Sequence, residues 1–321
     1  MLVLDGISKV YRVGTFGGRE LQAVTDVSFT VGPGEVVSLI GESGSGKSTI
    51  GKMILRLTPV TDGAITFDGT DVSTLRRRHL KEYYRGVQGV FQDPFSSYNP
   101  IFKTDRVFQM VRDQFFPDVA ASEWDGRVEV ALNGVGLDPA TCLHKYPHQL
   151  SGGQLQRLLI ARALLLDVDF LVADEIISML DASTRIDVLN LLADLKADGL
   201  SILFITHDLS LGYYLSDRSV ILYRGRIVEM GATAKVFANP LHPYTRMLLA
   251  SVARLDRRWD EDDAAPDGGG EGCVVCGRCT PSGAAGSETR LIEFEEDHMV
   301  ACHGGGTTGG GDGLATGVGA A

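Results

Sequence analysis

The sequence predicts an α/β protein built around a buried parallel sheet, and two apolar segments joined by a helical one carry this prediction. "FLVAD" (residues 170–174) and "SILFIT" (201–206) are short continuous apolar runs, the pattern of strands buried on both faces of a parallel sheet. The stretch "STRIDVLNLLADLKADG" (183–199) between them has the pattern of a helix that ends at Gly199. A strand, a crossover helix and a second strand in this order favour the α/β class.

Other segments predict smaller elements around this sheet. Alternating apolar positions in residues 1–30, with the turn "GTFGG", predict antiparallel strands. "AITFDG" (64–69) predicts another strand that ends in a turn at Asp68 and Gly69. Between about residues 99 and 150 apolar residues recur at helical spacing, so we expect a mainly helical insert that separates two halves of the core.

Composition and charge narrow the possible partners. With 321 residues and a net charge of −11 at pH 7, the chain lacks the excess of Lys and Arg that gives general affinity for nucleic acid. No run approaches the roughly 18 consecutive apolar residues of a spanning helix, and the first residues lack the pattern of a secretory signal. We therefore expect a cytosolic protein that touches a membrane only through a partner.

The stretch "GESGSGKST" (41–49) lies between a predicted strand and a predicted helix and matches G-x-x-x-x-G-K-[ST]. Its glycines allow backbone amides to point inward and, with the helix N-terminus, to form an anion cradle. Lys47 would reach the β- and γ-phosphates of a bound nucleotide triphosphate, Ser48 would hold Mg²⁺, and Thr49 would lie near the α-phosphate. The alternative is a turn that merely joins strand to helix. The candidate nucleotide-binding residues here are Gly41, Ser43, Gly44, Gly46, Lys47, Ser48 and Thr49.

Two further segments carry candidate chemistry. Asp174 ends one apolar strand and Glu175 follows it, as expected if the first carboxylate binds Mg²⁺ and the second polarises an attacking water. The alternative is a pair of acids that face solvent at a strand end. "LSGGQLQR" (150–157) could be only a helix start, in which Ser151 and Gln154 form a capping box.

The phosphate loop, "LSGGQ", "FLVADE", "SMLD" (178–181) and "ITHD" (205–208), in this order and spacing, resemble the ATP-binding subunit of an ABC transporter. The resemblance covers about residues 1–255. It implies a P-loop NTPase (RecA-like) core with the antiparallel β subdomain and the helical subdomain, at about 99–150, of an ABC ATPase. The expected division is an ABC ATPase domain (1–255), a Cys-containing segment (256–303) and a disordered Gly-rich tail (304–321).

The resemblance also implies roles for single residues. Glu175 and His207 become the catalytic residues, with His207 at the γ-phosphate, and Tyr11 stacks on adenine. The alternatives are a core histidine for His207 and a half-buried strand aromatic for Tyr11. The other implied ATP-site residues are Gln92, which contacts Mg²⁺ and the membrane subunit; Asp181, which lines a dimer interface; and Ser151, Gly152, Gly153 and Gln154, which cap the nucleotide of a facing partner.

Two segments narrow the subgroup. These segments, "FQDPFSSYNP" (91–100) and "NPLHPYTRMLL" (239–249), resemble the corresponding sequences of one subgroup of the family. That subgroup imports oligopeptides, dipeptides and, in some members, nickel or oligosaccharides. The chain departs from the usual pattern at Ile176 and Ile177, after the catalytic Glu, and at Gln149, before the signature.

The subgroup implies a peripheral subunit on the cytoplasmic face of the cell membrane. Its partners would be a second ATP-binding subunit, identical or different, two membrane-spanning permease subunits and, indirectly, an extracytoplasmic substrate-binding protein. The rival reading is a soluble ABC ATPase of DNA repair or translation. It is disfavoured because the insert is short, the chain has one cassette, and the net charge is acidic.

The C-terminal cysteines form a separate candidate site. Cys273, Cys276 and Cys279 have C-x₂-C-x₂-C spacing, and Cys302 follows in "VACH". Four thiolates suit an iron-sulfur cluster or Zn²⁺, of which we favour iron-sulfur. The alternative is a set of thiols without a metal, because the surrounding acidic and Gly-rich residues give little support for a preformed site.

Overall fold

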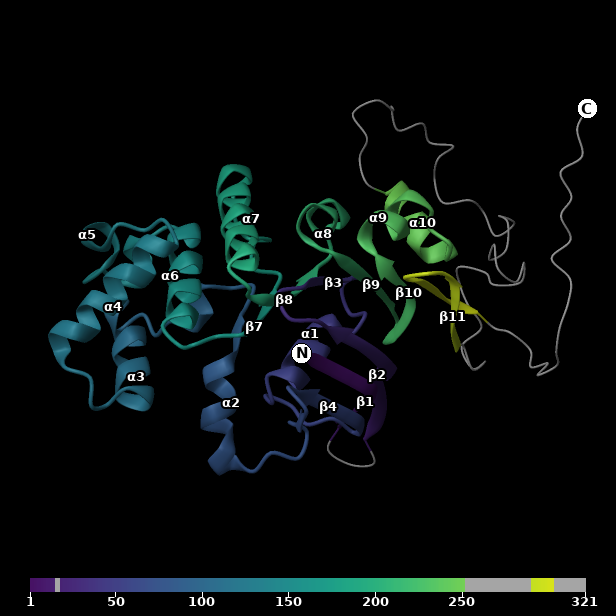
Figure 1. Ribbon diagram of the computed structural model, residues 1–321, viewed down its shortest axis with the longest axis horizontal. Helices are drawn as coiled ribbons and strands as arrows, with labels where there is room; N and C mark the ends of the chain where they lie inside the picture. The colour runs from purple at the N-terminus through teal and green to yellow at the C-terminus, as the bar shows by residue number, and fades with distance from the viewer. Residues whose placement is uncertain (15–17, 252–289, 303–321) are drawn as a thin grey trace, which may run out of the picture.

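The computed structural model describes residues 1–14, 18–251 and 290–302, and within them an eight-stranded sheet forms the centre of the molecule (Figure 1). In spatial order its strands are β11 (Arg290–Glu295), β12 (His298–Cys302), β10 (Arg226–Ala232), β9 (Arg218–Tyr223), β3 (Val36–Ile40), β8 (Ser201–Thr206), β7 (Phe170–Asp174) and β6 (Val87–Val90). The strands from β9 to β6 are parallel, whereas β9, β10, β12 and β11 pair antiparallel.

The central parallel strands are buried along their whole length. Every residue of β3, β7 and β8 is buried, which confirms the prediction from the continuous apolar runs. Ile40 is opposite Thr206, and Asp174 is opposite Ile205. The carboxyl ends of these strands therefore meet at one edge of the sheet, where open parallel sheets bind ligands.

The two faces of the sheet are covered differently (Figure 1). One face carries α7 (Ala182–Ala197), α8 (Leu209–Leu215), α9 (Thr233–Ala238) and α10 (Pro243–Ala250). The other carries α1 (Lys47–Ile54) and a four-stranded antiparallel sheet of β2 (Arg19–Val31), β1 (Leu2–Val13), β4 (Asp62–Phe67) and β5 (Thr70–Asp71). The turn expected after β4 has Asp68 at φ 46° and Gly69 at φ 77°.

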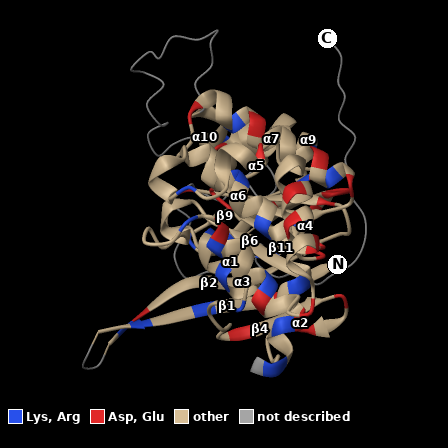
Figure 2. Ribbon diagram, turned by 90° about the vertical axis from the view of Figure 1, so that its left-hand side faces the viewer, with Lys and Arg blue, Asp and Glu red and all other residues tan. Residues whose placement is uncertain are grey.

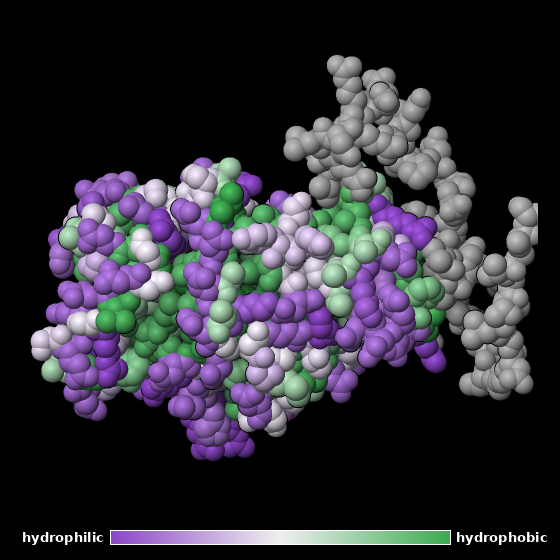
Figure 3. Space-filling view, turned by 45° about the horizontal axis from the view of Figure 1, so that its top comes forward, coloured by the Kyte–Doolittle hydropathy of each residue, from purple (hydrophilic) through white to green (hydrophobic). Residues whose placement is uncertain are grey.

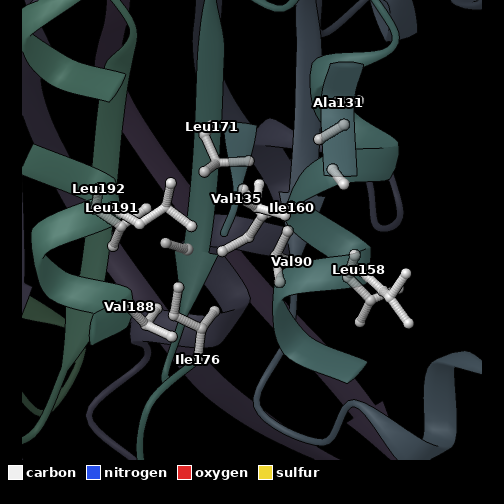
Figure 4. Packing of buried hydrophobic residues seen from close by; sticks show 14 of the residues in the cluster. Val90, Ala131, Val135, Leu158, Ile160, Leu171, Ile176, Val188, Leu191 and Leu192 are labelled. Carbon is white, nitrogen blue, oxygen red and sulfur yellow. The ribbon is translucent and has the colours of Figure 1, made fainter. Parts of the chain in front are cut away.

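A helical group lies beyond the β6 end of the sheet (Figure 1). It consists of α3 (Asp105–Phe115), α4 (Ala121–Gly134), α5 (Pro139–Cys142) and α6 (Gly152–Leu164), with α2 (Leu80–Gly86) leading to β6 and short 3₁₀ turns at Arg77–His79, Phe95–Ser97 and Pro147–Gln149. One apolar cluster joins this group to the sheet. In Figure 4, Leu171 of β7 lies between Leu192 of α7 and Ile160 of α6.

The hairpin formed by β11 and β12 is an element that the sequence analysis did not predict. Because β12 pairs with β10, residues far apart in the chain complete one end of the main sheet. Its His298 is fully buried, as is Glu229 of β10, and their side chains form a hydrogen-bonded pair. Within the residues that the structure describes, no helix has the length and apolar character needed to cross a membrane.

Candidate nucleotide-binding site

The loop before α1 needs glycine at its two tightest points. A Cβ at Gly41 would lie 2.2 Å from the carbonyl oxygen of Leu222, and one at Gly46 would lie 2.6 Å from that of Ala23. Gly46 also has φ 107° and Gly44 φ 82°, a region that residues with a Cβ rarely adopt. The loop is thus curled against β9 and β2, with its end at the N-terminus of an eight-residue helix.

Lys47 lies inside this curl. Its side chain is buried, and Nζ donates to the carbonyl oxygens of Gly41 at 2.7 Å and Glu42 at 2.9 Å. Burial lowers the pKa of Lys47, and the nearby carboxylates of Glu175, Asp174 and Glu42 oppose that shift. A buried cation therefore lies between the loop and the N-terminus of α1, where the oxygens of a bound anion could replace its carbonyl partners.

Ser48 and Asp174 supply oxygen ligands beside the loop. Ser48 Oγ donates to Asp174 Oδ1 at 3.0 Å, and Asp174 is 7% exposed. Burial raises the pKa of Asp174, whereas the bond from Ser48 lowers it. A hydroxyl and a carboxylate oxygen are the hard donors that Mg²⁺ prefers, so these residues fit the predicted magnesium site.

Glu175 has an unusual backbone at the end of β7. Its φ is 50°, in the left-handed region, which costs a non-glycine residue about 1–3 kcal/mol. Its N–H donates to the carbonyl of Ile205 at 2.9 Å, which anchors it to β8. His207 Nδ1 lies 3.4 Å from Glu175 Oε1, and the side chains are 56% and 16% exposed, respectively. The two predicted catalytic residues are therefore neighbours at the carboxyl edge of the sheet.

Gln92 belongs to the same edge. It follows β6, whose Val90 is opposite Ala173 of β7, and its side chain is exposed. The preceding residue, Phe91, is hydrogen-bonded to the signature helix: Gln156 Nε2 donates to its carbonyl oxygen at 3.4 Å. The structure thus brings Gln92 to the end of the sheet that also carries Asp174 and Glu175.

The signature segment starts α6, and its capping box is confirmed. Ser151 Oγ accepts from the Gln154 N–H at 3.2 Å, and Gln154 Oε1 accepts from the Ser151 N–H at 2.9 Å. A Cβ at Gly153 would lie 2.2 Å from Thr184 Cγ2, so this glycine also permits close packing of α6 on α7. Helix α6 packs against α3, α4, α7 and the edge strand β6, whereas α1 packs against β2, β7 and β8 (Figure 1). Within one chain, Ser151, Gly152 and Gly153 therefore belong to a different layer from the phosphate loop.

Comparisons with known proteins decide the family. The family model described as ABC transporter matches residues 24–178, and that of the oligopeptide/dipeptide transporter C-terminal region matches residues 228–285. The oligopeptide transport ATP-binding protein AppF of Bacillus subtilis is 39% identical over 323 residues, which cover 94% of this chain and 97% of AppF. The chain belongs to the ATP-binding proteins of ABC transporters.

Two further comparisons agree with this membership. The oligopeptide transport ATP-binding protein OppF of Bacillus subtilis is 42% identical over 244 residues, which cover 75% of this ABC ATPase and 80% of OppF. The dimeric, post-hydrolysis structure of the ATP-binding cassette MJ0796, bound to ADP and phosphate, is similar with a TM-score of 0.65 at 28% identity. That match covers 73% of this chain and 99% of the cassette. The ATPase cassette fold predicted from the sequence is confirmed, and with it an ATP-hydrolysing enzyme.

Tyr11 of the ABC ATPase lies in the projecting ribbon of β1 and β2, which Figure 2 shows with several basic residues. It pairs with Leu21 and is partly exposed, and Lys9 Nζ lies 5.1 Å from its ring centroid. Two residues beyond Leu21, the Ala23 carbonyl lies against Gly46. The ribbon therefore reaches the phosphate loop, while stacking of Tyr11 on adenine stays a prediction.

Asp181 caps α7 of the ABC ATPase. Its carboxylate accepts from the Thr184 N–H at 3.0 Å and from the hydroxyls of Ser183 and Thr184. These bonds lower its pKa well below the usual range, with that from Ser183 the largest cause. The residue is exposed, and its role at a dimer interface stays a prediction.

Ile176 and Ile177, the departures noted in the sequence, are 1% and 2% exposed. Ile176 lies beside Val188 of α7 (Figure 4), so it anchors the turn that carries Glu175 through packing. Gln149 accepts from the Tyr146 N–H at 2.9 Å within the turn before the signature. Both departures have structural roles that leave the oxygens around the phosphate loop untouched.

Three of the four candidate cysteines, Cys273, Cys276 and Cys279, lie outside the described residues. Cys302 is described: it ends β12 and is 4% exposed. In the described part of the chain, no group of three or more His, Cys, Asp or Glu side chains is placed to hold a metal ion.

One contact at the phosphate loop was not predicted from the sequence. The hydroxyl of Tyr244, from the "HPY" stretch of α10, accepts a hydrogen bond from the Glu42 N–H at 3.1 Å. The stretch stood out in the sequence, yet no local pattern indicates that α10 reaches the loop.

Proposed function

We propose that this chain is the subunit that hydrolyses ATP to energise an importer of oligopeptides or dipeptides. The observation that carries the proposal is the match of residues 228–285 to the oligopeptide/dipeptide transporter C-terminal region. The names of AppF and OppF, both oligopeptide transport ATP-binding proteins, support it. Nickel and oligosaccharides, which the sequence left open as cargo, find no specific support in the structure.

The proposed roles at the site follow from the contacts. Lys47 would exchange the carbonyl oxygens of Gly41 and Glu42 for phosphate oxygens, and Ser48, Asp174 and Gln92 would hold Mg²⁺. When bound, Mg²⁺ neutralises negative charge on the phosphates. Glu175 would accept a proton from the attacking water, and His207 beside it would contact the γ-phosphate.

We infer that two ATP-binding subunits close on two nucleotides. The signature residues Ser151, Gly152 and Gly153 lie at the N-terminus of a thirteen-residue helix, in a layer of the chain separate from its own phosphate loop. A helix N-terminus attracts phosphate, so these residues are suited to a nucleotide presented by a partner. The post-hydrolysis structure of the cassette MJ0796, which is dimeric, supports this arrangement.

The segment after Gln92 suits a contact with permease subunits. Phe95, Ile101 and Phe102 are 49%, 76% and 50% exposed, and apolar side chains exposed together mark interaction sites. Figure 3 shows apolar surface on the side of the molecule where α3 to α6 lie. We propose that this side faces two permease subunits, which would place the chain on the cytoplasmic face of the membrane, with a substrate-binding protein acting from the other side.

The domain division and the cysteine site also remain proposals. We infer an ABC ATPase domain at 1–255 and a cysteine-bearing segment at 256–303, part of which, β11 and β12, pairs with β10. Cysteine spacing alone supports an iron-sulfur or zinc site at Cys273, Cys276, Cys279 and Cys302.

Replacing Lys47 by alanine is expected to weaken ATP binding at least about tenfold, because charged hydrogen bonds to phosphate contribute about 1.5–3 kcal/mol. The measurement is the dissociation constant of ATP by calorimetry. Lys103→Ala is the control, since Lys103 is exposed and belongs to the helical insert rather than to the loop, and it should leave binding unchanged. Equal affinities for both variants would remove Lys47 from the site.

The function itself is tested on the assembled transporter. Affinity purification of the tagged chain from detergent-solubilised membranes is expected to recover two permease subunits and a second ATP-binding subunit. In vesicles containing that assembly and its binding protein, ATP should drive uptake of a labelled oligopeptide or dipeptide. Uptake of nickel or an oligosaccharide instead, or recovery of nucleic-acid-bound complexes without permeases, would overturn the proposal.

A further inference from the structure

The buried Tyr244 of α10 contacts residues outside its own helix, including the phosphate loop. The residue is 0% exposed, and its ring packs against Tyr223 with centroids 4.3 Å apart. Its hydroxyl oxygen accepts a hydrogen bond from the backbone N–H of Glu42, the second residue of the phosphate loop, at 3.1 Å. A side chain from the C-terminal part of the cassette therefore touches the loop proposed to hold ATP.

Both backbone polar groups of Glu42, the N–H and the carbonyl oxygen, are hydrogen-bonded. Its N–H is bound by Tyr244, whereas its carbonyl oxygen accepts from Lys47 Nζ at 2.9 Å and from the Ser45 N–H at 3.2 Å. If Lys47 turns to phosphate oxygens when ATP binds, it must leave that carbonyl. Tyr244 is then the side chain that still fixes this end of the loop.

A buried network fixes Tyr244 in turn. His242 Nδ1 accepts from the Tyr244 N–H at 3.1 Å, and Glu229 accepts from the N–H groups of Leu241 and His242 at 2.8 and 2.9 Å. The other bond to Glu229 comes from His298 Nε2 at 2.8 Å, on the C-terminal hairpin. The helix that carries Tyr244 is thus tied at its start to β10 and β12 and has little freedom to move.

We propose that Tyr244 is a positioning residue that holds the Glu42 amide and so keeps the phosphate loop in its binding conformation. The proposal rests on the proposed ATP site, and it assigns the "HPY" stretch a part in nucleotide affinity. Burial raises the pKa of Tyr244 to about 12. The oxygen of the neutral hydroxyl accepts from the Glu42 amide. Preorganisation of a loop favours binding because the ordering has been completed beforehand.

The test is the full-length variant Tyr244→Phe, which keeps the ring and removes only the hydroxyl. Loss of one neutral hydrogen bond to the loop is expected to weaken ATP binding about three- to tenfold. The KM for ATP should rise by a similar factor, with kcat within about twofold of the parent, because Tyr244 touches no reacting group. Tyr223→Phe is the matched control: it removes a hydroxyl from the adjacent ring and should leave the ATP affinity unchanged.

Thermal unfolding separates positioning from mere stability. The stabilisation that saturating ATP adds should be smaller for Tyr244→Phe than for the parent, whatever the melting temperature without ATP. ATP affinity unchanged in Tyr244→Phe, or weakened equally in Tyr223→Phe, would overturn the proposal. Failure of the parent chain itself to bind ATP would refute the proposed site, an outcome distinct from a failure confined to Tyr244.

Discussion

Replacing Glu175 by glutamine is expected to lower ATP hydrolysis about 10²- to 10⁴-fold while ATP binding persists. Glutamine keeps the size of the side chain and its place beside His207, but it cannot accept a proton from water. The loop contacts made by Lys47 and Ser48 are untouched by this change. The measurement is phosphate release by the assembled transporter, together with the dissociation constant of ATP.

The control is Glu129→Gln, which removes the same charge from an exposed position on α4. It should hydrolyse ATP at the parent rate. Turnover of Glu175→Gln close to that of Glu129→Gln would mean that another group activates the water. Loss of ATP binding in Glu175→Gln would instead indicate that Glu175 acts through the charge around Lys47.

Replacing Glu229 by glutamine is expected to reduce the free energy of unfolding by about 1–3 kcal/mol, because a buried donor would be left without its acceptor. The carboxylate is fully buried and accepts from Leu241 N–H, His242 N–H and His298 Nε2. A glutamine amide presents one oxygen and one NH₂ group, so at least one of these donors would face another donor. The measurement is unfolding of the full-length chain in urea.

The control variant is Glu123→Gln, which removes a carboxylate from a surface ion pair. Glu123 accepts from Arg127 at 2.7 Å, four residues along α4, with both side chains largely exposed. Such pairs contribute about 0–1 kcal/mol, so this variant should unfold close to the parent. Similar losses of stability in Glu229→Gln and Glu123→Gln would show that the buried pair contributes little.

Local patterns carried most of what could be predicted. Continuous apolar runs identified β7 and β8, because strands buried on both faces need apolar residues at every position. Ser151 and Gln154 are three residues apart, so their capping box depends on no distant contact. The glycine, lysine and serine of the phosphate loop likewise form a contiguous motif whose backbone requirements can be derived from spacing alone.

Contacts between residues far apart in the chain could not be predicted from the sequence. Glu229 and His298 are 69 residues apart, and in the sequence each is an ordinary polar residue of a strand. Their burial arises only when β12 pairs with β10. The contact of Tyr244 with Glu42 spans 202 residues, and the left-handed backbone of Glu175 depends on its anchor to β8. Such features follow from tertiary packing, which overrides local preference.

The hairpin of β11 and β12 also determines what the end of the sheet presents to other molecules. Without it, β10 would offer a row of free N–H and C=O groups beside apolar Ile227 and Val228, a template for pairing with another chain. In the described part of the chain the outermost strand is instead β11, which carries Arg290, Glu293 and Glu295. Charged side chains on an outer strand discourage strand-to-strand aggregation. The C-terminal hairpin thus replaces the β10 edge with an outer strand in which charged residues alternate with the partly exposed Ile292 and Phe294.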